Sequence, residues 1–227
     1  MDHHARRRDR LVQTLIAESL DALLISSAVN VTYLTGFTGD SSVVVLTKDR
    51  AVLVSDSRYT GQIADECPEL ELHLRQTSAK LPEAIAEVLR GLEVRTVGCE
   101  SLALTLSEAE ALREAAPTID WKPGSDRVEK LRMVKDEGEI AAIRHAIDIA
   151  ERAFTAFRSL LRADDCEKDL ADSLDHFVRR CGGIGCSFPP IVAVGTRASL
   201  PHCPPTTRKV HEASLLLVDW GATEPGG

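Results

Sequence analysis

The chain has 227 residues, of which 44% are hydrophobic and 27% are charged. Both fractions are ordinary for a folded globular protein, so the composition excludes a disordered or fibrous chain. The formal net charge of -8 opposes non-specific binding to nucleic acid or to anionic lipid. No apolar run approaches the roughly 20 residues that span a bilayer, and residues 1–10 lack the apolar core of a secretory signal. We therefore expect a cytoplasmic protein with no nucleic-acid or membrane partner.

Short apolar blocks alternate with helical patterns over the first half of the chain. Leu11, Leu15, Ile16 and Leu20 recur at helical spacing and predict a first helix over residues 11–20. Further strands are expected at 22–25, 43–46, 52–54 and 70–74, and further helices at 60–66, 81–89 and 107–115. Such alternation is typical of an α/β layered domain.

The break Lys122-Pro123-Gly124 separates this half from the next. We place the domain boundary there, with a first domain over residues 1–124 and a second over 125–227. In the second domain, helices are expected at 135–161 and 166–181, and strands at 191–194 and 215–220. The glycines at 182 and 183 are a fitting end for the second of these helices.

Three local patterns predict how particular segments are capped or exposed. Ser107 and Glu110 have the spacing of a capping box. His3, His4 and the arginines after them are expected to form a solvated, frayed end. In the long helix, apolar residues three and four apart predict one buried face. That face comprises Ile140, Ile143, Ile147, Ala150, Phe154, Phe157 and Leu161.

Several short patterns carry weak chemical signals. The run Gly182-Gly183-Ile184-Gly185 lacks the spacing of a dinucleotide or phosphate loop and follows a helix, not a strand. The sequence Gly39-Asp40-Ser41 has no nucleophile-elbow pattern, so a loop beside a strand is the simpler interpretation. The six cysteines are too scattered for a disulfide scaffold. Cys181, Cys186 and Cys203 with His202 fit no standard closed zinc site.

Two residues near the C-terminal end are stronger candidates. Asp219 follows four apolar residues, so it should end a strand, where a rigid backbone can aim a carboxylate as a metal ligand or base. The alternative is that Asp219 simply begins the turn at Gly221. His202 lies between Pro201 and Cys203-Pro204, so its backbone should be stiff and its imidazole fixed in place. The alternative is an ordinary loop histidine.

Six short motifs follow one another along the chain: Asn30–Phe37, Asp56–Tyr59, Arg132–Lys135 followed by Glu139-Ile140, Phe188–Ile191, Leu200–His202 and Val218–Gly221. In this order they resemble the creatinase and prolidase superfamily of pita-bread metallopeptidases, most closely its Xaa-Pro aminopeptidase and Xaa-Pro dipeptidase branch. The resemblance implies a creatinase-like N-terminal α/β domain with a mixed sheet, followed by the first part of a pita-bread α+β catalytic domain. It leaves the role of Asp56, Arg58 and Tyr59 open.

The resemblance also implies a mechanism. Two divalent metal ions, manganese, cobalt or zinc, would activate a water that attacks the peptide bond before proline. By resemblance, Asp219 would be the first metal ligand, and His202 would be a catalytic residue that donates a hydrogen bond to the substrate or the oxyanion. The full-length protein would act on proline-containing peptides as a homodimer.

Two departures from the family pattern qualify these expectations. Residues 194–197 read Val-Gly-Thr-Arg where the family often has Ser-Gly-Pro-Asn, which affects the loop near the histidine. The sequence ends at Gly227, before the family's second aspartate, its histidine and its two glutamates. We therefore expect this chain to be an inactive fragment that holds no metal stably. The alternatives are a non-catalytic binding protein of the same fold and a creatinase-like amidinohydrolase.

Overall fold

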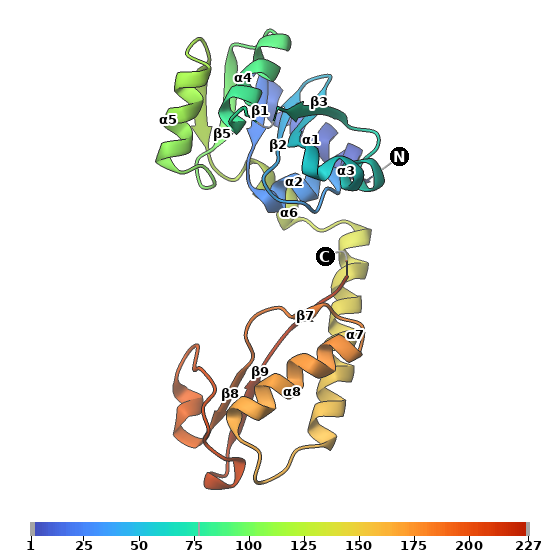
Figure 1. Ribbon diagram of the computed structural model, residues 1–227. Coiled ribbons are helices and arrows are strands. Elements are labelled where there is room, and N and C mark those ends of the chain that lie inside the picture. Colours follow the sequence, from blue (N-terminus) through green and yellow to red (C-terminus); the bar gives the residue numbers. More distant parts are fainter. Residues whose placement is uncertain (1–2, 77, 226–227) are drawn as a thin grey trace. The chain divides into compact units, whose positions relative to one another are not determined.

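The computed structural model describes residues 3–76 and 78–225 (Figure 1). Its internal contacts divide the chain into two compact units, residues 1–134 and 135–227. The expected boundary at residue 124 therefore falls inside the first unit. The reason is helix α6 (Arg127–Met133), whose Val128 is buried in the core of that unit.

A six-stranded mixed sheet lies at the centre of the first unit, in the order β4-β3-β2-β1-β5-β6. Its strands are β1 (Ala22–Ile25), β2 (Val43–Thr47), β3 (Ala51–Asp56), β4 (Glu71–Arg75), β5 (Thr96–Glu100) and β6 (Asp120–Gly124). Strands β1, β2 and β3 pair antiparallel, whereas β4, β5 and β6 add in parallel. The four predicted strands are confirmed. The predicted break at Lys122-Pro123-Gly124 is instead edge strand β6, a position where proline is tolerated because one side of the strand is unpaired.

Helices cover both faces of this sheet. They are α1 (His3–Ala17), α2 (Ala28–Thr35), α3 (Thr60–Glu66), α4 (Leu81–Gly91) and α5 (Leu106–Ala115), with a short 3₁₀ helix η1 (Ser57–Tyr59). Alternate strand residues point to opposite faces, so Leu23 and Ile25 pack in one hydrophobic core while Ala22 and Leu24 pack in the other. The first core also contains residues of α1, α2, α3 and α6, and the second contains residues of α4 and α5.

The start of helix α5 differs from its prediction. The capping residue is Thr105, whose hydroxyl accepts the amide of Glu108 at 3.2 Å. The Glu108 carboxylate in turn accepts the amide of Thr105 at 2.8 Å. The predicted box of Ser107 and Glu110 is therefore wrong by two positions, because Thr105 and Glu108 have the same spacing and an equally suitable pair of side chains.

The N-terminal segment is also more ordered than predicted. Arg7 is only 8% exposed, and its guanidinium donates a hydrogen bond to the Tyr33 carbonyl at 3.0 Å. The same guanidinium lies 4.1 Å from the centroid of the Tyr33 ring, a favourable cation–π distance. His4 lies 3.1 Å from the same carbonyl. These contacts with α2 overturn the prediction of a frayed end, because the basic side chains have partners that the sequence alone does not reveal.

The second unit packs two helices against short strands. It contains α7 (Glu137–Ser159), α8 (Glu167–Arg180), β7 (Gly185–Cys186), β8 (Ile191–Val194), β9 (Leu216–Asp219) and β10 (Ala222–Thr223), with 3₁₀ helices η2 (Gly195–Ser199) and η3 (Val210–Glu212). Strands β8 and β9 form one antiparallel pair, and β7 and β10 form another. Helix α8 packs through Leu170 and Leu174 against Val192 of β8 and Phe157 of α7. The predicted helices and strands of this unit are confirmed.

Only the C-terminal half of the predicted face of α7 is buried. Phe157 is 2% exposed, but Ile140, Ile143 and Ile147 are 39%, 46% and 51% exposed. The prediction of one continuous buried face is therefore wrong for the first turns of the helix. Within the described residues, the elements that pack most extensively on α7 are α8 and the short strand β10, and they cover its later turns.

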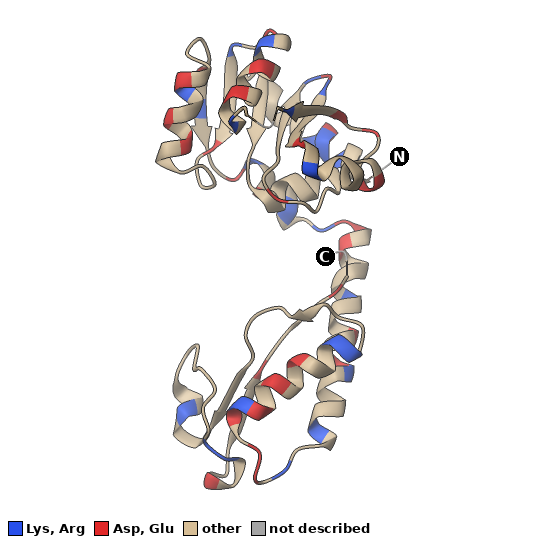
Figure 2. Ribbon diagram, in the orientation of Figure 1, with Lys and Arg blue, Asp and Glu red and all other residues tan. Residues whose placement is uncertain are grey.

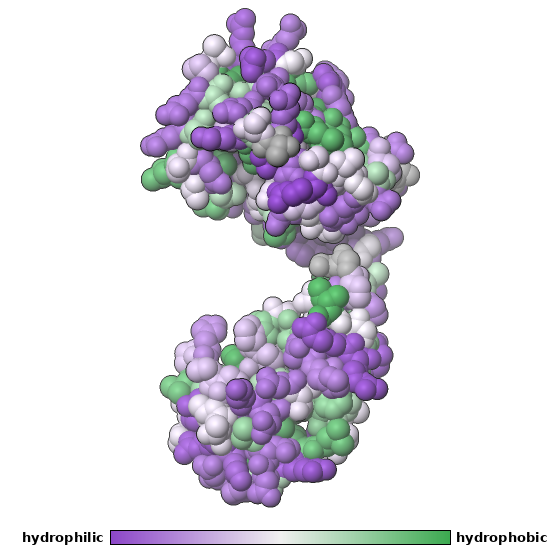
Figure 3. Space-filling model, in the orientation of Figure 1, coloured by the Kyte–Doolittle hydropathy of each residue, from purple (hydrophilic) through white to green (hydrophobic). Residues whose placement is uncertain are grey.

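The surface is polar and of mixed charge. Acidic and basic residues are interspersed along the helices of both units (Figure 2), and hydrophilic residues dominate the visible face, with smaller hydrophobic patches between them (Figure 3). Across the described ranges, no helix combines the length and apolar character needed to cross a membrane. The six cysteines are free thiols.

Candidate functional site

A groove in the second unit brings the two candidate residues together. It has a cavity volume of about 910 Å³ and is lined by residues 188–191, residues 198–205 and two residues of β9. These segments contain the Phe188–Ile191 and Leu200–His202 motifs and Asp219 of the last motif, so both His202 and Asp219 lie on the groove wall. Segments far apart in the sequence therefore form one surface.

Asp219 is the last residue of β9 and is exposed. Antiparallel pairing places it opposite Ile191 of β8. The next residue, Trp220, anchors the strand end: its ring stacks on Phe154 with 4.2 Å between centroids, and its indole donates to the Ala150 carbonyl at 3.3 Å. The pairing with Ile191 and the contacts of Trp220 thus fix the backbone that carries the Asp219 carboxylate. A metal ligand or a base requires such a fixed backbone.

His202 is exposed on the loop that follows η2, and its backbone adopts a left-handed conformation with φ of 53°. That conformation is uncommon for residues other than glycine, although histidine is among those enriched in it. Its neighbour Cys203 is only 2% exposed. The buried thiol of Cys203 and the prolines on either side of the pair, Pro201 and Pro204, restrict the backbone that carries the imidazole.

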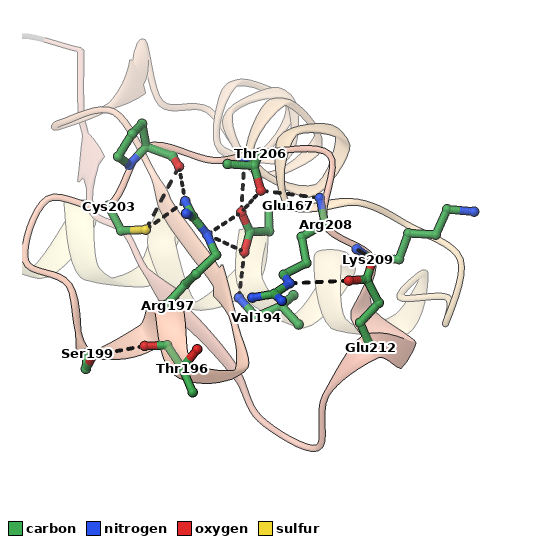
Figure 4. A network of polar contacts seen from close by, with 11 residues as sticks. Glu167, Val194, Thr196, Arg197, Ser199, Cys203, Thr206, Arg208, Lys209 and Glu212 are labelled. Atoms are coloured by element: carbon green, nitrogen blue, oxygen red, sulfur yellow. Dashed lines mark hydrogen bonds and ion pairs between the residues drawn. The ribbon is translucent and has the colours of Figure 1, made fainter.

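A polar network around the buried carboxylate of Glu167 holds this loop (Figure 4). Arg197 donates to the Pro204 carbonyl at 2.7 Å and to the Cys203 sulfur at 3.0 Å. The Arg197 Nε donates to the carboxylate of Glu167 at 3.2 Å. Glu167 is fully buried at the start of α8. Arg197 is one of the residues that depart from the family pattern, and the network shows what it contacts. Glu167 is not among the residues predicted from the sequence, although its position in the first turn of a predicted helix was the available signal.

A second hollow has a volume of about 950 Å³ and shares the Phe188–Pro190 segment with the groove as part of its lining. Asp175 and Cys186 line this second hollow. The Cys186 amide donates to the Asp175 carboxylate at 2.8 Å and is the main reason why the pKa of Asp175 is lowered. Burial first, and then the charge of Asp175, raise the pKa of the Cys186 thiol to about 11. This thiol is therefore protonated at neutral pH.

The described residues do not by themselves form a metal centre. In residues 3–76 and 78–225, no three histidine, cysteine, aspartate or glutamate side chains gather closely enough to hold an ion. Asp219 is the only carboxylate among the described residues that line the groove. Divalent cations need several ligands each, so one carboxylate is not a sufficient donor set, and the weak zinc pattern of the cysteines finds no support in the described part of the chain.

The motif Asp56–Tyr59 forms a separate cluster in the first unit. Asp56 accepts hydrogen bonds from the Arg58 guanidinium at 3.0 and 2.7 Å, from the Arg58 amide at 3.0 Å and from Arg75 at 2.9 Å. The Arg58 side chain is the main cause that holds the pKa of Asp56 well below its usual range. The Tyr59 hydroxyl donates to Asp40, so the Gly39-Asp40-Ser41 stretch is a loop tied to this cluster.

Comparison with known proteins identifies the class of protein that carries these motifs. Residues 7–134 match the Creatinase/Prolidase N-terminal domain, and residues 141–226 match Metallopeptidase family M24. The chain belongs to the creatinase and prolidase family. The predicted resemblance and the predicted α/β fold with a mixed sheet are confirmed.

Individual relatives are peptidases. The chain is 30% identical to an uncharacterized peptidase of Bacillus subtilis, over 91% of this chain and 58% of that protein. The structure is similar to an Xaa-Pro dipeptidase from Bacillus anthracis, with a TM-score of 0.89, 29% identity, and coverage of 96% of this chain and 61% of that one. It is also similar to an X-Pro aminopeptidase from Thermotoga maritima, with a TM-score of 0.87, 32% identity and coverage of 96% and 61%. The chain thus spans about three fifths of the length of these relatives.

Proposed function

We propose that the protein to which this chain belongs is a metal-dependent peptidase that cleaves the bond before proline, and that the groove is part of its active site. The observation that carries the proposal is the convergence of the Phe188–Ile191, Leu200–His202 and β9 segments on one surface, with His202 and Asp219 on its wall. Two structurally similar proteins bear the names Xaa-Pro dipeptidase and X-Pro aminopeptidase, which supports this substrate class.

Each candidate residue has a role in this proposal. Asp219 supplies one carboxylate to a centre of two divalent cations, manganese, cobalt or zinc, whose other ligands lie outside the described residues. When bound, such ions supply an activated water and polarise the scissile carbonyl. His202 donates a hydrogen bond to the substrate carbonyl or to the oxyanion that develops from it, a contact that contributes about 3 kcal/mol to lowering the barrier.

The composition of the groove fits a proline-containing peptide. Its wall carries the rings of Phe188, Pro189 and Pro190 and the side chains of Leu200 and Leu217. These apolar groups can cover a pyrrolidine ring, because burial of apolar surface is favourable without needing a hydrogen-bond partner. The same proposal gives the chain a creatinase-like N-terminal domain and the first portion of a catalytic domain. It also makes the full-length protein a homodimer in the cytoplasm.

Hydrolysis of matched peptides tests the proposed function. The protein, at the full length that its gene encodes, is incubated with manganese and with peptides that differ only in having proline or alanine after the scissile bond. We expect cleavage of the proline peptide only, and loss of that cleavage when a chelator removes the metal. Folded protein that takes up manganese but leaves the proline peptide intact would contradict the proposal, as would equal cleavage of both peptides.

A further inference from the structure

Glu167 is a fully buried carboxylate that lies outside the set of residues lining the groove. Burial of a charged carboxylate costs several kcal/mol unless hydrogen bonds and an opposite charge compensate for it. Its compensation is extensive: it accepts the amide of Val194 at 2.7 Å, and the amide and hydroxyl of Thr206 at 2.8 and 2.6 Å. Arg197 supplies the opposite charge at 3.2 Å. A carboxylate satisfied in this way is fixed in position.

The partners of Glu167 are the two ends of one loop. Val194 is the last residue of β8, directly before the loop, and Thr206 lies just after its prolines. The loop between them carries His202. One carboxylate on α8 therefore binds both the residue at which this loop leaves β8 and the residue that follows the loop's prolines (Figure 4).

Arg197 connects the same carboxylate to the residues beside the histidine. From within the loop, its guanidinium reaches the Pro204 carbonyl and the sulfur of Cys203, which directly follows His202. The left-handed backbone of His202 costs energy and persists only where the surroundings determine it. The contacts of Arg197 with Cys203 and Pro204, supported by Glu167, hold the backbone next to His202 in place. His202 itself lies on the groove wall.

We propose that Glu167 is a positioning residue which, through Arg197 and Thr206, holds the loop over residues 195–205 so that His202 faces the substrate in the groove. This inference rests on the proposed peptidase function for the role of His202. It goes beyond that function because it makes Glu167, which does not touch the substrate, responsible for the position from which His202 does.

The charge state of Glu167 agrees with this role. Burial alone raises the pKa of Glu167, but the hydrogen bonds from Thr206 and Val194 and the charge of Arg197 outweigh it, and the net pKa is lowered. The group therefore stays ionised at neutral pH and acts as a permanent acceptor. A residue of this kind should influence the reaction only through the loop.

The variant Glu167→Gln tests the proposal, because it keeps the size of the side chain while removing the charge and one acceptor oxygen. We expect kcat on the proline peptide to fall roughly a hundredfold, close to the loss caused by His202→Gln, with a small change in KM. The double variant should be no slower than His202→Gln alone, because a displaced loop no longer presents the histidine. The matched control is Glu151→Gln, an exposed glutamate on α7 that should retain normal kcat.

Amide hydrogen exchange provides a readout that is independent of activity. In Glu167→Gln, residues 195–206 should exchange faster, while the core of α8 around Leu174 keeps its protection. Should Glu167→Gln fail to fold, Arg197→Lys keeps the positive charge but not the geometry of the guanidinium, and should lower kcat roughly tenfold with the same local exchange.

The outcomes separate the two proposals. Absence of Xaa-Pro cleavage by the unmodified protein refutes the proposed function, and unchanged exchange over residues 195–206 refutes the role of Glu167 in holding the loop. Normal kcat in a folded Glu167→Gln protein, or a double variant in which the two losses multiply, overturns the positioning role while the peptidase function stands.

Discussion

Asp219 lies directly opposite Ile191 in the antiparallel pair formed by β8 and β9. Ile191 ends the Phe188–Ile191 motif, so this register places the carboxylate beside the apolar wall of the groove. A slip by one residue would turn the Asp219 side chain to the opposite face of the strand pair. The strand pairing thus determines which groups share the groove.

Replacement of His202 by glutamine should lower kcat on a proline peptide by roughly a hundredfold with little effect on KM, because the lost hydrogen bond strengthens as the oxyanion forms. Steady-state kinetics measure this loss. The control is His176→Gln, an exposed histidine on α8, which should leave both constants unchanged. A larger effect on KM than on kcat would place His202 in ground-state binding instead.

In the protein at its full encoded length, Asp219→Asn should abolish stoichiometric manganese uptake while leaving stability within about 0.5 kcal/mol, because the side chain is exposed and asparagine has the same size. Calorimetric titration with manganese and urea unfolding measure the two effects. The exposed carboxylate of Asp164 provides the control, as Asp164→Asn. Unchanged manganese uptake in Asp219→Asn would exclude this residue as a ligand.

The ion-pair cluster at Asp56 should make the stability of the first unit depend on pH. A carboxyl group whose native pKa is depressed stabilises the fold at pH values above its unfolded pKa, and that stabilisation is lost as the pH falls through the native value. The difference in unfolding free energy between the unmodified protein and Asp56→Asn should be constant from about pH 5 to 8 and should shrink below about pH 4. Urea unfolding at each pH measures it.

The matched variant for this series is Asp49→Asn, at an exposed position in the turn between β2 and β3. It should show a small difference with no such trend. A difference for Asp56→Asn that grows as the pH falls would contradict the assigned direction of the pKa shift.

Cys186 should react slowly with iodoacetamide. With its pKa raised to about 11, the thiolate fraction at pH 8.5 is roughly a hundredfold below that of an ordinary thiol. Mass spectrometry of the alkylated peptide measures the rate, and the same protein unfolded in urea is the reference. Equal rates in the native and unfolded states would show that the thiol is neither buried nor raised in pKa.

The sequence patterns reveal strands β1 to β4 more readily than strands β5 and β6, which lie together at one side of the sheet. Strands β1, β2 and β3 are continuous apolar runs, as buried strands are. Strand β5 contains Gly98 and β6 contains Pro123, both of which weaken a strand pattern. Helix α2 was missed as well, and its buried Asn30 is bound by Glu100 and Glu129, which lie 70 and 99 residues away. Patterns within a short window cannot show such contacts.

In the candidate site, too, some residues are predictable from their sequence neighbours and others depend on contacts between distant segments. His202 and Asp219 were predicted because their neighbours form recognisable motifs. The contacts of Glu167 with Val194 and Thr206 span 27 and 39 residues and arise only when α8 packs against β8. The exposed half of α7 was not predicted either, because helical spacing indicates an apolar face but not what covers it.

Paramagnetic line broadening by manganese, in the amide spectrum of the protein at its full encoded length, tests directly whether the groove is part of a metallopeptidase active site. Bound Mn²⁺ broadens the signals of nearby nuclei, so it reports its own location. We predict broadening centred on Asp219 that extends to His202, and its loss in Asp219→Asn. Broadening centred on the carboxylates of the first unit, or none at all in the groove, would show that the groove is not the metal site.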